Sequence, residues 1–311
     1  MINILVLVGL PGSGKTTVAK NILETSGIYS KIISSDSIRE ELFGDENVQA
    51  DNALVFKIYH DRLADAITKG ESVILDATNV TIKVRKHVFE TVQRVKKLVS
   101  DQIHVKALVV NTPIETVIKQ DVERKRVVGA DVIYKYIYSY QHPQKYEGFE
   151  EVCLLYNSTG FNEKKLDELK MQMLDFDQNN PHHIYCLFIH CLFVACHLVY
   201  DDIMYQAGML HDVGKLFTRT NDENGVSHFK GHDSYGTYYL VSNPDLLNYK
   251  TNDELNEILF YINFHMRAHR DFKGRKAIQK HRNLFGNERY EKLMQFGEYD
   301  RIASGTYDGG E

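Results

Sequence analysis

The chain has 311 residues, of which 43% are hydrophobic and 25% are charged, and its formal net charge is −5. This length predicts about two globular domains. It contains no run of about 18 apolar residues, which excludes a membrane-spanning helix. The slightly negative charge excludes a long basic surface for nucleic acid, although a small basic pocket for one strand end is compatible with it.

A buried strand and a glycine-rich loop open the chain. Residues 4–8 are apolar and largely β-branched, as in a parallel strand that is covered on both faces. The pattern G-x-x-x-x-G-K-[ST] follows from Gly9 to Thr16, and a helix is predicted to begin near Lys15. This context predicts a P-loop that binds ATP, with Lys15 on the β- and γ-phosphates and Thr16 on Mg²⁺. The predicted ATP-binding residues are Gly9, Leu10, Pro11, Gly12, Ser13, Gly14, Lys15, Thr16 and Thr17.

Asp36 follows the next predicted strand, residues 31–34. The ends of parallel strands face the ligand crevice of an open α/β sheet. Two interpretations remain open from the residues alone. Asp36 is either a helix N-cap or, beside a P-loop, the group that accepts the proton of an attacking hydroxyl.

Strands and helices continue to alternate through the first half. Strands are predicted at 72–75, 105–110 and 152–156, and helices at 51–69, 81–98 and 133–140. Asp76 ends the first of these strands, where a carboxylate suits the support of Mg²⁺. The alternation predicts an α/β fold with a doubly wound parallel sheet.

The charged run 121–126 is either a solvated helix face or a lid over the triphosphate. The lid interpretation is favoured because phosphoryl transfer needs positive charge on the phosphate oxygens. Arg124 and Arg126 are the lid candidates.

These motifs resemble the 5′-kinase domain of phage polynucleotide kinases and their bacterial RNA-repair relatives. The resemblance covers about residues 1–156 and rests on G-L-P-G-S-G-K-T, S-S-D-S-I-R, D-A-T-N and E-R-K-R. It implies transfer of the γ-phosphate of ATP to a 5′-hydroxyl of RNA or DNA. It further implies that Asp36 is the general base, that Arg39 binds the terminal phosphodiester of the acceptor, and that Arg126 is the lid arginine.

The polar segment 160–168 marks the predicted boundary between a P-loop domain, 1–160, and a second domain, 175–311. Strand signals then disappear. Apolar-periodic segments at 184–199, 203–210, 234–241, 255–264 and 289–302 predict an all-α bundle.

Ten of the 14 histidines fall in this second half. His211 and Asp212 end an apolar helix, where imidazole and carboxylate suit a divalent ion. Lys215 follows one turn later and could hold a substrate phosphate. The histidines concerned are His182, His183, His190, His197, His211, His228, His232, His265, His269 and His281.

Residues 181–304 resemble the HD phosphohydrolase superfamily in the chain order His, His-Asp, His, His, Asp. The resemblance implies two ions, drawn from Mn²⁺, Ni²⁺, Fe²⁺ and Co²⁺, that activate water at a phosphoester. His183 lies seven residues before His190, which would place it two turns away on the same helix face, and it is the alternative first ligand or a phosphate contact. Arg267 and His269 are candidate rim residues. The implied ligands are His190, His211, Asp212 and Asp300 for one ion, and His232 and His265 for the second, with Asp212 shared.

Together the two motif sets predict a bifunctional enzyme that heals nucleic-acid ends. The kinase half would phosphorylate a 5′-hydroxyl of RNA or DNA, and the HD half would remove a terminal phosphate or open a 2′,3′-cyclic phosphate. One alternative is a small-molecule or nucleotide kinase joined to a nucleotidase. Another is an ATP-gated switch without catalysis, in which the HD domain senses a nucleotide.

The four cysteines, Cys153, Cys186, Cys191 and Cys196, show no zinc spacing. They predict buried thiols in a reducing compartment and therefore a cytoplasmic protein. Because the N-terminus begins directly with a core strand, no signal peptide is expected.

Overall fold

The computed structural model describes residues 1–45, 50–124, 127–157, 160–181, 183–270 and 274–305. The chain forms two compact units. Unit 1 consists of Met1–Tyr136 and Pro143–Tyr156, and unit 2 consists of Ile137–His142 and Asn157–Glu311. The boundaries expected from the sequence, 1–160 and 175–311, stay a prediction. The two units differ from these predicted domains in two places. Unit 2 includes residues 137–142, and it begins again at residue 157.

Unit 1 is built on a five-stranded parallel sheet with the order β2-β3-β1-β4-β5. The central strand β1 is almost completely buried, as its unbroken apolar sequence requires. The parallel α/β fold expected from the sequence is confirmed. The strands are β1 (Ile2–Val8), β2 (Lys31–Ser34), β3 (Val73–Asp76), β4 (Ile103–Val109) and β5 (Glu151–Leu154).

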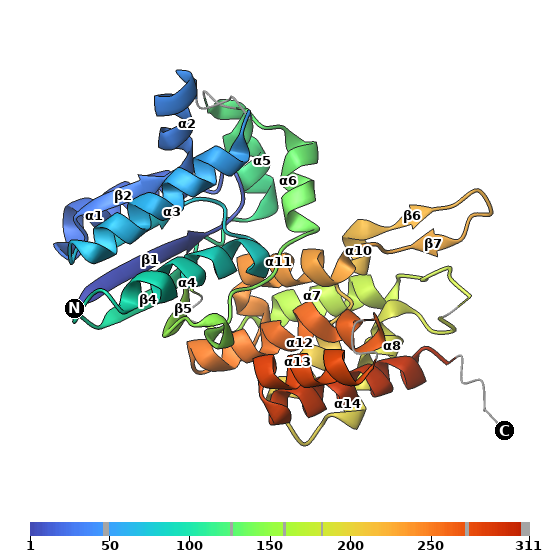
Figure 1. The fold of residues 1–311 in the computed structure, drawn as a ribbon. Coiled ribbons are helices and arrows are strands. Elements are labelled where there is room, and N and C mark those ends of the chain that lie inside the picture. The colour runs from blue at the N-terminus through green and yellow to red at the C-terminus, as the bar shows by residue number, and fades with distance from the viewer. Residues whose placement is uncertain (46–49, 125–126, 158–159, 182, 271–273, 306–311) are drawn as a thin grey trace. The chain divides into compact units, whose positions relative to one another are not determined.

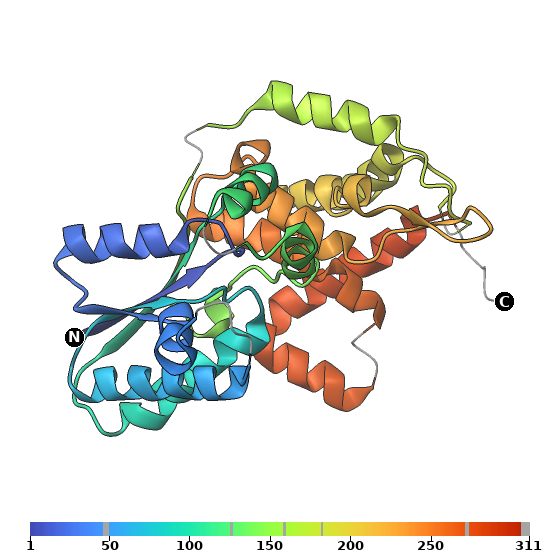
Figure 2. The ribbon, with the colours of Figure 1, turned by 90° about the horizontal axis from the view of Figure 1, so that it is seen from above.

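Helices cover both faces of this sheet. In Figure 2, α1 lies on one face, and α3 and α4 lie on the other. The helix expected at 133–140 begins and ends three residues earlier. The helices of unit 1 are α1 (Lys15–Ser26), α2 (Ser35–Phe43), α3 (Asn52–Thr68), α4 (Ile82–Lys96), α5 (Ile114–Glu123) and α6 (Ala130–Ile137), with a 3-10 turn η1 (Lys145–Glu147) before β5.

Unit 2 is mostly helical, as expected. Its buried helix α12 packs against α9, α11 and α14 (Figure 1). The helices are α7 (Glu163–Leu174), α8 (Leu187–His197), α9 (Asp202–Leu210), α10 (Lys215–Thr218), α11 (His232–Ser242), α12 (Asn252–Arg270), α13 (Arg275–Phe285) and α14 (Asn287–Ala303), with a 3-10 turn η2 (Pro244–Leu246).

Several elements of unit 2 were not expected. Helix α7 begins inside the polar segment that was assigned to the boundary, and α13 was not predicted and has Phe285 as its buried residue. Strands β6 (Thr220–Asn221) and β7 (Ser227–His228) form a short antiparallel hairpin after α10, although no strand was predicted in this half (Figure 1).

Among the described residues, none of the helices combines the length and the apolar composition that a membrane crossing requires. All four cysteines are free thiols. The expectation that they are buried is wrong for three of them, because only Cys191 is fully buried and Cys196 is exposed.

Candidate functional sites

A cavity of about 960 Å³ lies at the carboxyl ends of β1, β2 and β3 in unit 1. Its size suits a nucleotide, because small-molecule sites commonly enclose 300–1,000 Å³. The cavity is also lined by residues that the sequence did not single out, including Asn52, Phe56 and Tyr136. The predicted residues that line it are Pro11, Gly12, Gly14, Lys15, Thr16, Thr17, Asp36, Arg39 and Arg124.

Three predicted residues of the glycine-rich loop, Gly9, Leu10 and Ser13, do not line the cavity. The Leu10 side chain is buried, and its carbonyl oxygen accepts a hydrogen bond from Lys15 Nζ at 2.6 Å. The Ser13 carbonyl accepts one from the Thr112 hydroxyl at 2.8 Å. Leu10 and Ser13 therefore stabilise the conformation of the loop through their backbone carbonyls and do not face the cavity.

Lys15 and Thr16 begin helix α1 directly after Gly14, which has a φ of 89°. Burial lowers the pKa of Lys15 to about 8, although the carboxylates of Asp76 and Asp36 act in the opposite direction. The Thr16 hydroxyl donates to Asp76 Oδ2 at 2.7 Å. A hydroxyl and a carboxylate in this arrangement can hold Mg²⁺ beside a triphosphate.

Asp36 lies in the first turn of α2, and its side chain is 44% exposed. It is not the N-cap, because Ser34 has that place and its side chain accepts from Ser37 N–H. The alternative that Asp36 is a plain helix cap is therefore wrong. Arg39 is buried and donates to Asp36 Oδ1 at 2.7 Å and to Asn52 Oδ1 at 3.0 Å. A carboxylate and a guanidinium thus meet at the cavity wall.

The connection between α5 and α6 carries the predicted lid. Arg124 lines the cavity and pairs with Asp121 Oδ1 at 2.8 Å. Arg126 lies outside the described residues. Asp121, which the sequence did not single out, is buried and accepts hydrogen bonds from the backbone N–H groups of Val128 and Gly129. One carboxylate therefore holds both ends of this connection.

A second support, also missed, lies behind the ends of β1 and β3. The Asn79 side chain donates to the Leu7 carbonyl at 2.9 Å, and the Asn79 carbonyl accepts from Arg85 at 2.9 Å. Arg85 is in turn held by two bonds of 2.8 Å to Glu147. Asn79, to which no role was assigned, is the last residue of the D-A-T-N motif, and its left-handed backbone, with a φ of 50°, is one that asparagine tolerates.

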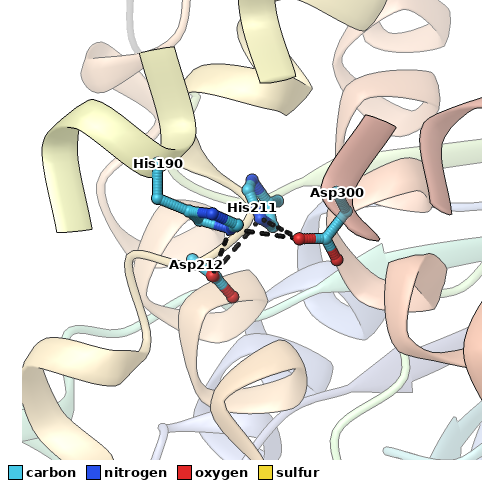
Figure 3. Close-up of side chains that lie close together, drawn as sticks. All are labelled: His190, His211, Asp212 and Asp300. Carbon is cyan, nitrogen blue, oxygen red and sulfur yellow. Dashed lines mark ion pairs between the residues drawn. The ribbon is translucent and has the colours of Figure 1, made fainter. Parts of the chain in front are cut away.

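The second site is a buried cluster of imidazoles and carboxylates in unit 2. Helix α8 supplies His190, the end of α9 supplies His211 and Asp212, and α14 supplies Asp300. His190 Nε2 lies 3.2 Å from Asp212 Oδ2 and 3.0 Å from Asp300 Oδ1, and His211 Nε2 lies 3.3 and 3.5 Å from the same oxygens. Figure 3 shows the four side chains directed toward one another.

Asp212 also faces a second pair of imidazoles, through its other carboxylate oxygen. Asp212 Oδ1 lies 3.0 Å from His232 Nε2 on α11 and 3.6 Å from His265 Nε2 on α12. The two Nε2 atoms are 3.1 Å apart. Two lone pairs at this distance repel each other unless a cation or a proton lies between them. Both sets have the spacing of metal ligands, with Asp212 shared.

Backbone carbonyls orient three of these rings. The Nδ1 atoms of His211, His232 and His265 lie 2.9, 2.7 and 2.7 Å from the carbonyl oxygens of residues 208, 229 and 262. A carbonyl can only accept, so Nδ1 carries the proton and Nε2 presents its lone pair. This is the usual arrangement of histidines that bind metal.

Burial and neighbouring charges oppose each other in the cluster. Burial alone would raise the pKa of Asp212 and of Asp300. Lys215 and the imidazoles outweigh burial at Asp212, and the imidazoles alone outweigh it at Asp300, so that both pKa values lie well below the usual range. Burial would lower the pKa of His190, but the two carboxylates raise it to about 9. Both carboxylates are therefore ionised, which is the form in which they can bind a metal ion.

Lys215, the first residue of α10, lies beside the cluster. Its Nζ is 2.7 Å from Asp212 Oδ2, donates to Gln178 Oε1 at 2.8 Å, and lies 3.2 Å from His183 Nε2. His183 precedes α8, so the expectation that it shares a helix face with His190 is wrong. Burial and the charge of Lys215 lower the pKa of His183 to about 3. The ring is therefore neutral and faces the lysine.

Two glycines allow the close packing that assembles the cluster. A Cβ on Gly208 would lie 2.9 Å from the Ala195 Cα, where α9 crosses α8. A Cβ on Gly214 would lie 2.0 Å from the His232 carbonyl oxygen, where the loop after Asp212 meets α11. Larger residues would separate the elements that carry the ligands.

The remaining candidates lie near the cluster or outside the described part of the chain. His269 Nε2 lies 2.9 Å from Asp300 Oδ2, so it contacts the carboxylate from the other side. The Arg267 guanidinium lies over the Phe264 ring at 4.5 Å. His182 is not among the described residues.

A family model described as an AAA domain matches residues 4–143, which is less than half of the chain. The match covers the P-loop, most of β1 and all of β2 to β4 in unit 1, whose parallel sheet flanked by helices is P-loop kinase-like in its fold.

Solved structures with some similarity include a chain of the Pnkp1/Rnl/Hen1 RNA repair complex. It has 22% identity and a TM-score of 0.36, over 43% of this chain and 42% of that chain. A fungal RNA kinase has 21% identity and a TM-score of 0.38, over 58% and 45%. A gluconokinase from Sinorhizobium meliloti 1021 has 13% identity and a TM-score of 0.33, over 50% and 84%. The chain spans less than half the length of the first two. These low scores do not identify an activity or a substrate.

Proposed function

We propose that the protein is a bifunctional enzyme that heals nucleic-acid ends. Unit 1 transfers the γ-phosphate of ATP to a 5′-hydroxyl of RNA or DNA. Unit 2 is an HD-type phosphoesterase that removes a terminal phosphate or opens a 2′,3′-cyclic phosphate. The observation that supports both activities is that one chain carries a nucleotide-sized cavity with a P-loop and a buried, shared-carboxylate His/Asp cluster.

In the kinase reaction, Lys15 and Arg124 bind the phosphates of ATP, and the sequence adds Arg126. Thr16 and Asp76, whose side-chain oxygen atoms lie 2.7 Å apart, would hold Mg²⁺. Both partners are oxygen donors, which Mg²⁺ prefers. Positioning and positive charge are the main demands of phosphoryl transfer.

Asp36 accepts the proton of the attacking hydroxyl. The oxygen of that hydroxyl forms a bond to the γ-phosphorus, the bond from this phosphorus to the β,γ-bridging oxygen breaks, and ADP leaves. Arg39 is the candidate for holding the first phosphodiester of the acceptor. Arg39 contacts Asp36 at 2.7 Å. A phosphodiester bound to Arg39 therefore brings the neighbouring 5′-hydroxyl of the acceptor close to the Asp36 carboxylate.

In the phosphoesterase site, the donor chemistry fits divalent metal ions. Three of the four imidazoles in the ligand sets present Nε2 because their Nδ1 atoms bond to carbonyls. One ligand set has four imidazole or carboxylate donors and the other has three. Such donors suit Mn²⁺, Fe²⁺, Co²⁺ or Ni²⁺. Bound ions would supply Lewis-acid activation of water at the phosphoester. His190, His211, Asp212 and Asp300 would hold one ion, and His232, His265 and Asp212 the other.

Lys215 is placed to hold the substrate phosphate in this site. Its Nζ lies beside Asp212, and Gln178 and His183 fix its position from the other side. A lysine held in this way presents its ammonium group as a point charge to a phosphate oxygen. The neutral His183 ring can donate a further hydrogen bond from Nδ1.

The kinase proposal is tested with γ-labelled ATP and a panel of acceptors. We expect label on RNA or DNA strands that end in a 5′-hydroxyl, and none on strands that end in a 5′-phosphate. Label on free nucleosides or sugars in preference to strands would favour the small-molecule kinase instead. No labelled product with any acceptor, metal or pH would remove the kinase proposal.

The phosphoesterase proposal is tested separately with 3′-phosphate and 2′,3′-cyclic phosphate ends in the presence of Mn²⁺, Ni²⁺, Co²⁺ or Fe²⁺. Hydrolysis of either end supports the proposal. Binding of nucleotides without hydrolysis of any phosphoester would favour the sensing alternative.

A further inference from the structure

Three planar side chains of unit 2 lie together beside the phosphoesterase cluster. The Arg219 guanidinium lies 3.9 Å from the centre of the Phe176 ring and 5.8 Å from that of Phe229. The two rings are 6.0 Å apart at an interplanar angle of 53°. Both rings are half-buried, and Arg219 is exposed. We call Phe176, Arg219 and Phe229 the aromatic platform.

The platform connects directly to the cluster. The Phe229 carbonyl oxygen lies 2.7 Å from Nδ1 of the candidate ligand His232. The Phe229 ring lies 5.4 Å from Nζ of Lys215, and this ammonium group is 2.7 Å from Asp212. A series of contacts therefore runs from the shared carboxylate through the phosphate-binding lysine to the two rings and then to the exposed arginine.

Hydrogen bonds hold the two segments of the platform together. Phe229 follows the β6–β7 hairpin, and Phe176 precedes the segment 177–180. Ser227 N–H donates to the Asn179 carbonyl at 3.0 Å, and the Asn180 amide donates to the Ser227 carbonyl at 2.7 Å. The Arg219 guanidinium also donates to the Asp177 carbonyl. The rings are therefore held in a fixed place rather than carried on independent loops.

Planar side chains beside a phosphate site are what a nucleotide end requires. Bases stack on phenylalanine rings and on guanidinium planes, and the stacking tolerates any base because every base has a π face. None of the candidate metal ligands lies on the hairpin or the platform. The backbone carbonyl of Phe229 orients His232, but the planar groups of Phe176, Arg219 and Phe229 contact no candidate ligand through a bond of their own.

We propose that the aromatic platform binds the terminal nucleobase of a single-stranded end whose phosphate is held by Lys215 and the cluster. The site then selects nucleotide ends over phosphoesters that lack a base. This inference rests on the proposed phosphoesterase activity of unit 2.

The test compares two oligonucleotides with the metal-loaded, full-length protein. Both end in a 3′-phosphate, and they differ only in whether the last nucleotide has a base or is abasic. The variants Phe176→Leu and Arg219→Lys keep the apolar volume or the charge but lose the planar group. Phe176→Tyr keeps the ring and serves as the rescue variant.

We expect both planar-group variants to raise the KM for the base-containing end by about tenfold, since stacking of one base is typically worth 1–3 kcal/mol. The kcat for this end and both constants for the abasic end stay near wild-type values, and Phe176→Tyr restores the KM. Arg282→Lys is the matched control. It alters another guanidinium that lies over a ring, that of Tyr290 at 5.0 Å, and we expect no change.

Two results would overturn the inference, and they are distinguishable. If wild-type protein hydrolyses both ends equally well, or the variants affect both ends alike, the platform does not bind a base although the phosphoesterase proposal stands. If wild-type protein hydrolyses neither end with any of the four metals, the phosphoesterase proposal fails for these ends and the platform proposal fails with it.

Discussion

The two candidate sites are built in opposite ways. The kinase-like cavity of unit 1 takes most of its residues from one short segment, 11–17, and from residues that follow parallel strands, and it is open enough for a nucleotide. The cluster of unit 2 takes its residues from α8, α9, α11, α12 and α14, which span 111 residues from His190 to Asp300, and its members are buried. Loop geometry defines the first site, and helix packing defines the second.

This difference determines how each site can be damaged. The cavity depends on a few side chains on a sheet edge whose backbone is fixed by strand pairing. The cluster depends on how closely several helices approach, so a substitution without any polar atom can disperse it. Because no ligand of either site belongs to the other unit, we expect the two activities to be separable.

The largest expected effect is the selective loss of one activity. We expect Lys15→Ala to reduce strand phosphorylation to background while hydrolysis is retained, because the phosphates lose their buried cation. Asp212→Ala should do the reverse, because both ligand sets share this carboxylate. Both activities are measured on the same preparations.

Matched controls are Lys69→Ala, an exposed lysine paired with Asp65 on α3, and His197→Ala, an exposed histidine on the same helix as His190. Both should retain both activities. Loss of both activities in Lys15→Ala or in Asp212→Ala, with folding intact, would mean that one composite site performs both reactions.

The next effect concerns the proposed general base. Asp36→Asn keeps the size of the side chain but cannot accept the proton, so we expect a loss of about 10²–10⁴ in kcat for strand phosphorylation. The Kd for ATP should change little, because the P-loop is intact. An unchanged kcat would exclude Asp36 as the base. Asp65→Asn, at an exposed position on α3, is the matched control.

A packing substitution should affect unit 2 alone. Gly208→Ala places a methyl group 2.9 Å from the Ala195 backbone, and overpacking of this kind typically costs about 1–3 kcal/mol. We expect a lower Tm for unit 2 and weaker metal binding, with strand phosphorylation unchanged. Gly160→Ala, where the added methyl group meets open space, is the control. Full metal affinity in Gly208→Ala would show that the cluster tolerates helix separation.

The smallest effect is a pH dependence of ATP binding. The pKa of Lys15 is lowered to about 8 by burial, so its charge is complete below this pH and is lost as the pH rises through 8. Since the charged form binds phosphate, the Kd for ATP measured by calorimetry should rise about tenfold between pH 7 and pH 9. A flat profile would mean that the lysine stays charged throughout.

The contrast between the sites also explains what the sequence could predict. The P-loop was identifiable because strand, glycines, Lys15 and Thr16 are adjacent in the chain. The Asn79–Arg85–Glu147 support was missed because it joins segments that only the folded domain brings close. Asp121 was missed although it binds the backbone of the connection that follows its own helix. A carboxylate in a charged run gives no signal that it will be buried.

In unit 2, the resemblance carried by the chain order His, His-Asp, His, His, Asp implied which residues would meet. Those residues form two groups with ligand spacing that share Asp212. The position of His183 was predicted wrongly because α8, the helix that carries His190, begins only at Leu187, four residues after His183. The hairpin was missed because strands of two residues are too short to show alternation. The contact between Phe176 and Arg219 could not be predicted either, because these residues are 43 positions apart and no repeating sequence pattern connects them.

The metal content of the full-length protein tests the central claim most directly. After loading with Mn²⁺ and removal of free ions, mass spectrometry should find two ions per wild-type chain, one in His232→Ala and none in Asp212→Ala, with two retained in His197→Ala. A wild-type chain that binds no transition metal, or an Asp212→Ala chain that binds as much as wild type, would contradict the assignment of this cluster as a two-metal centre.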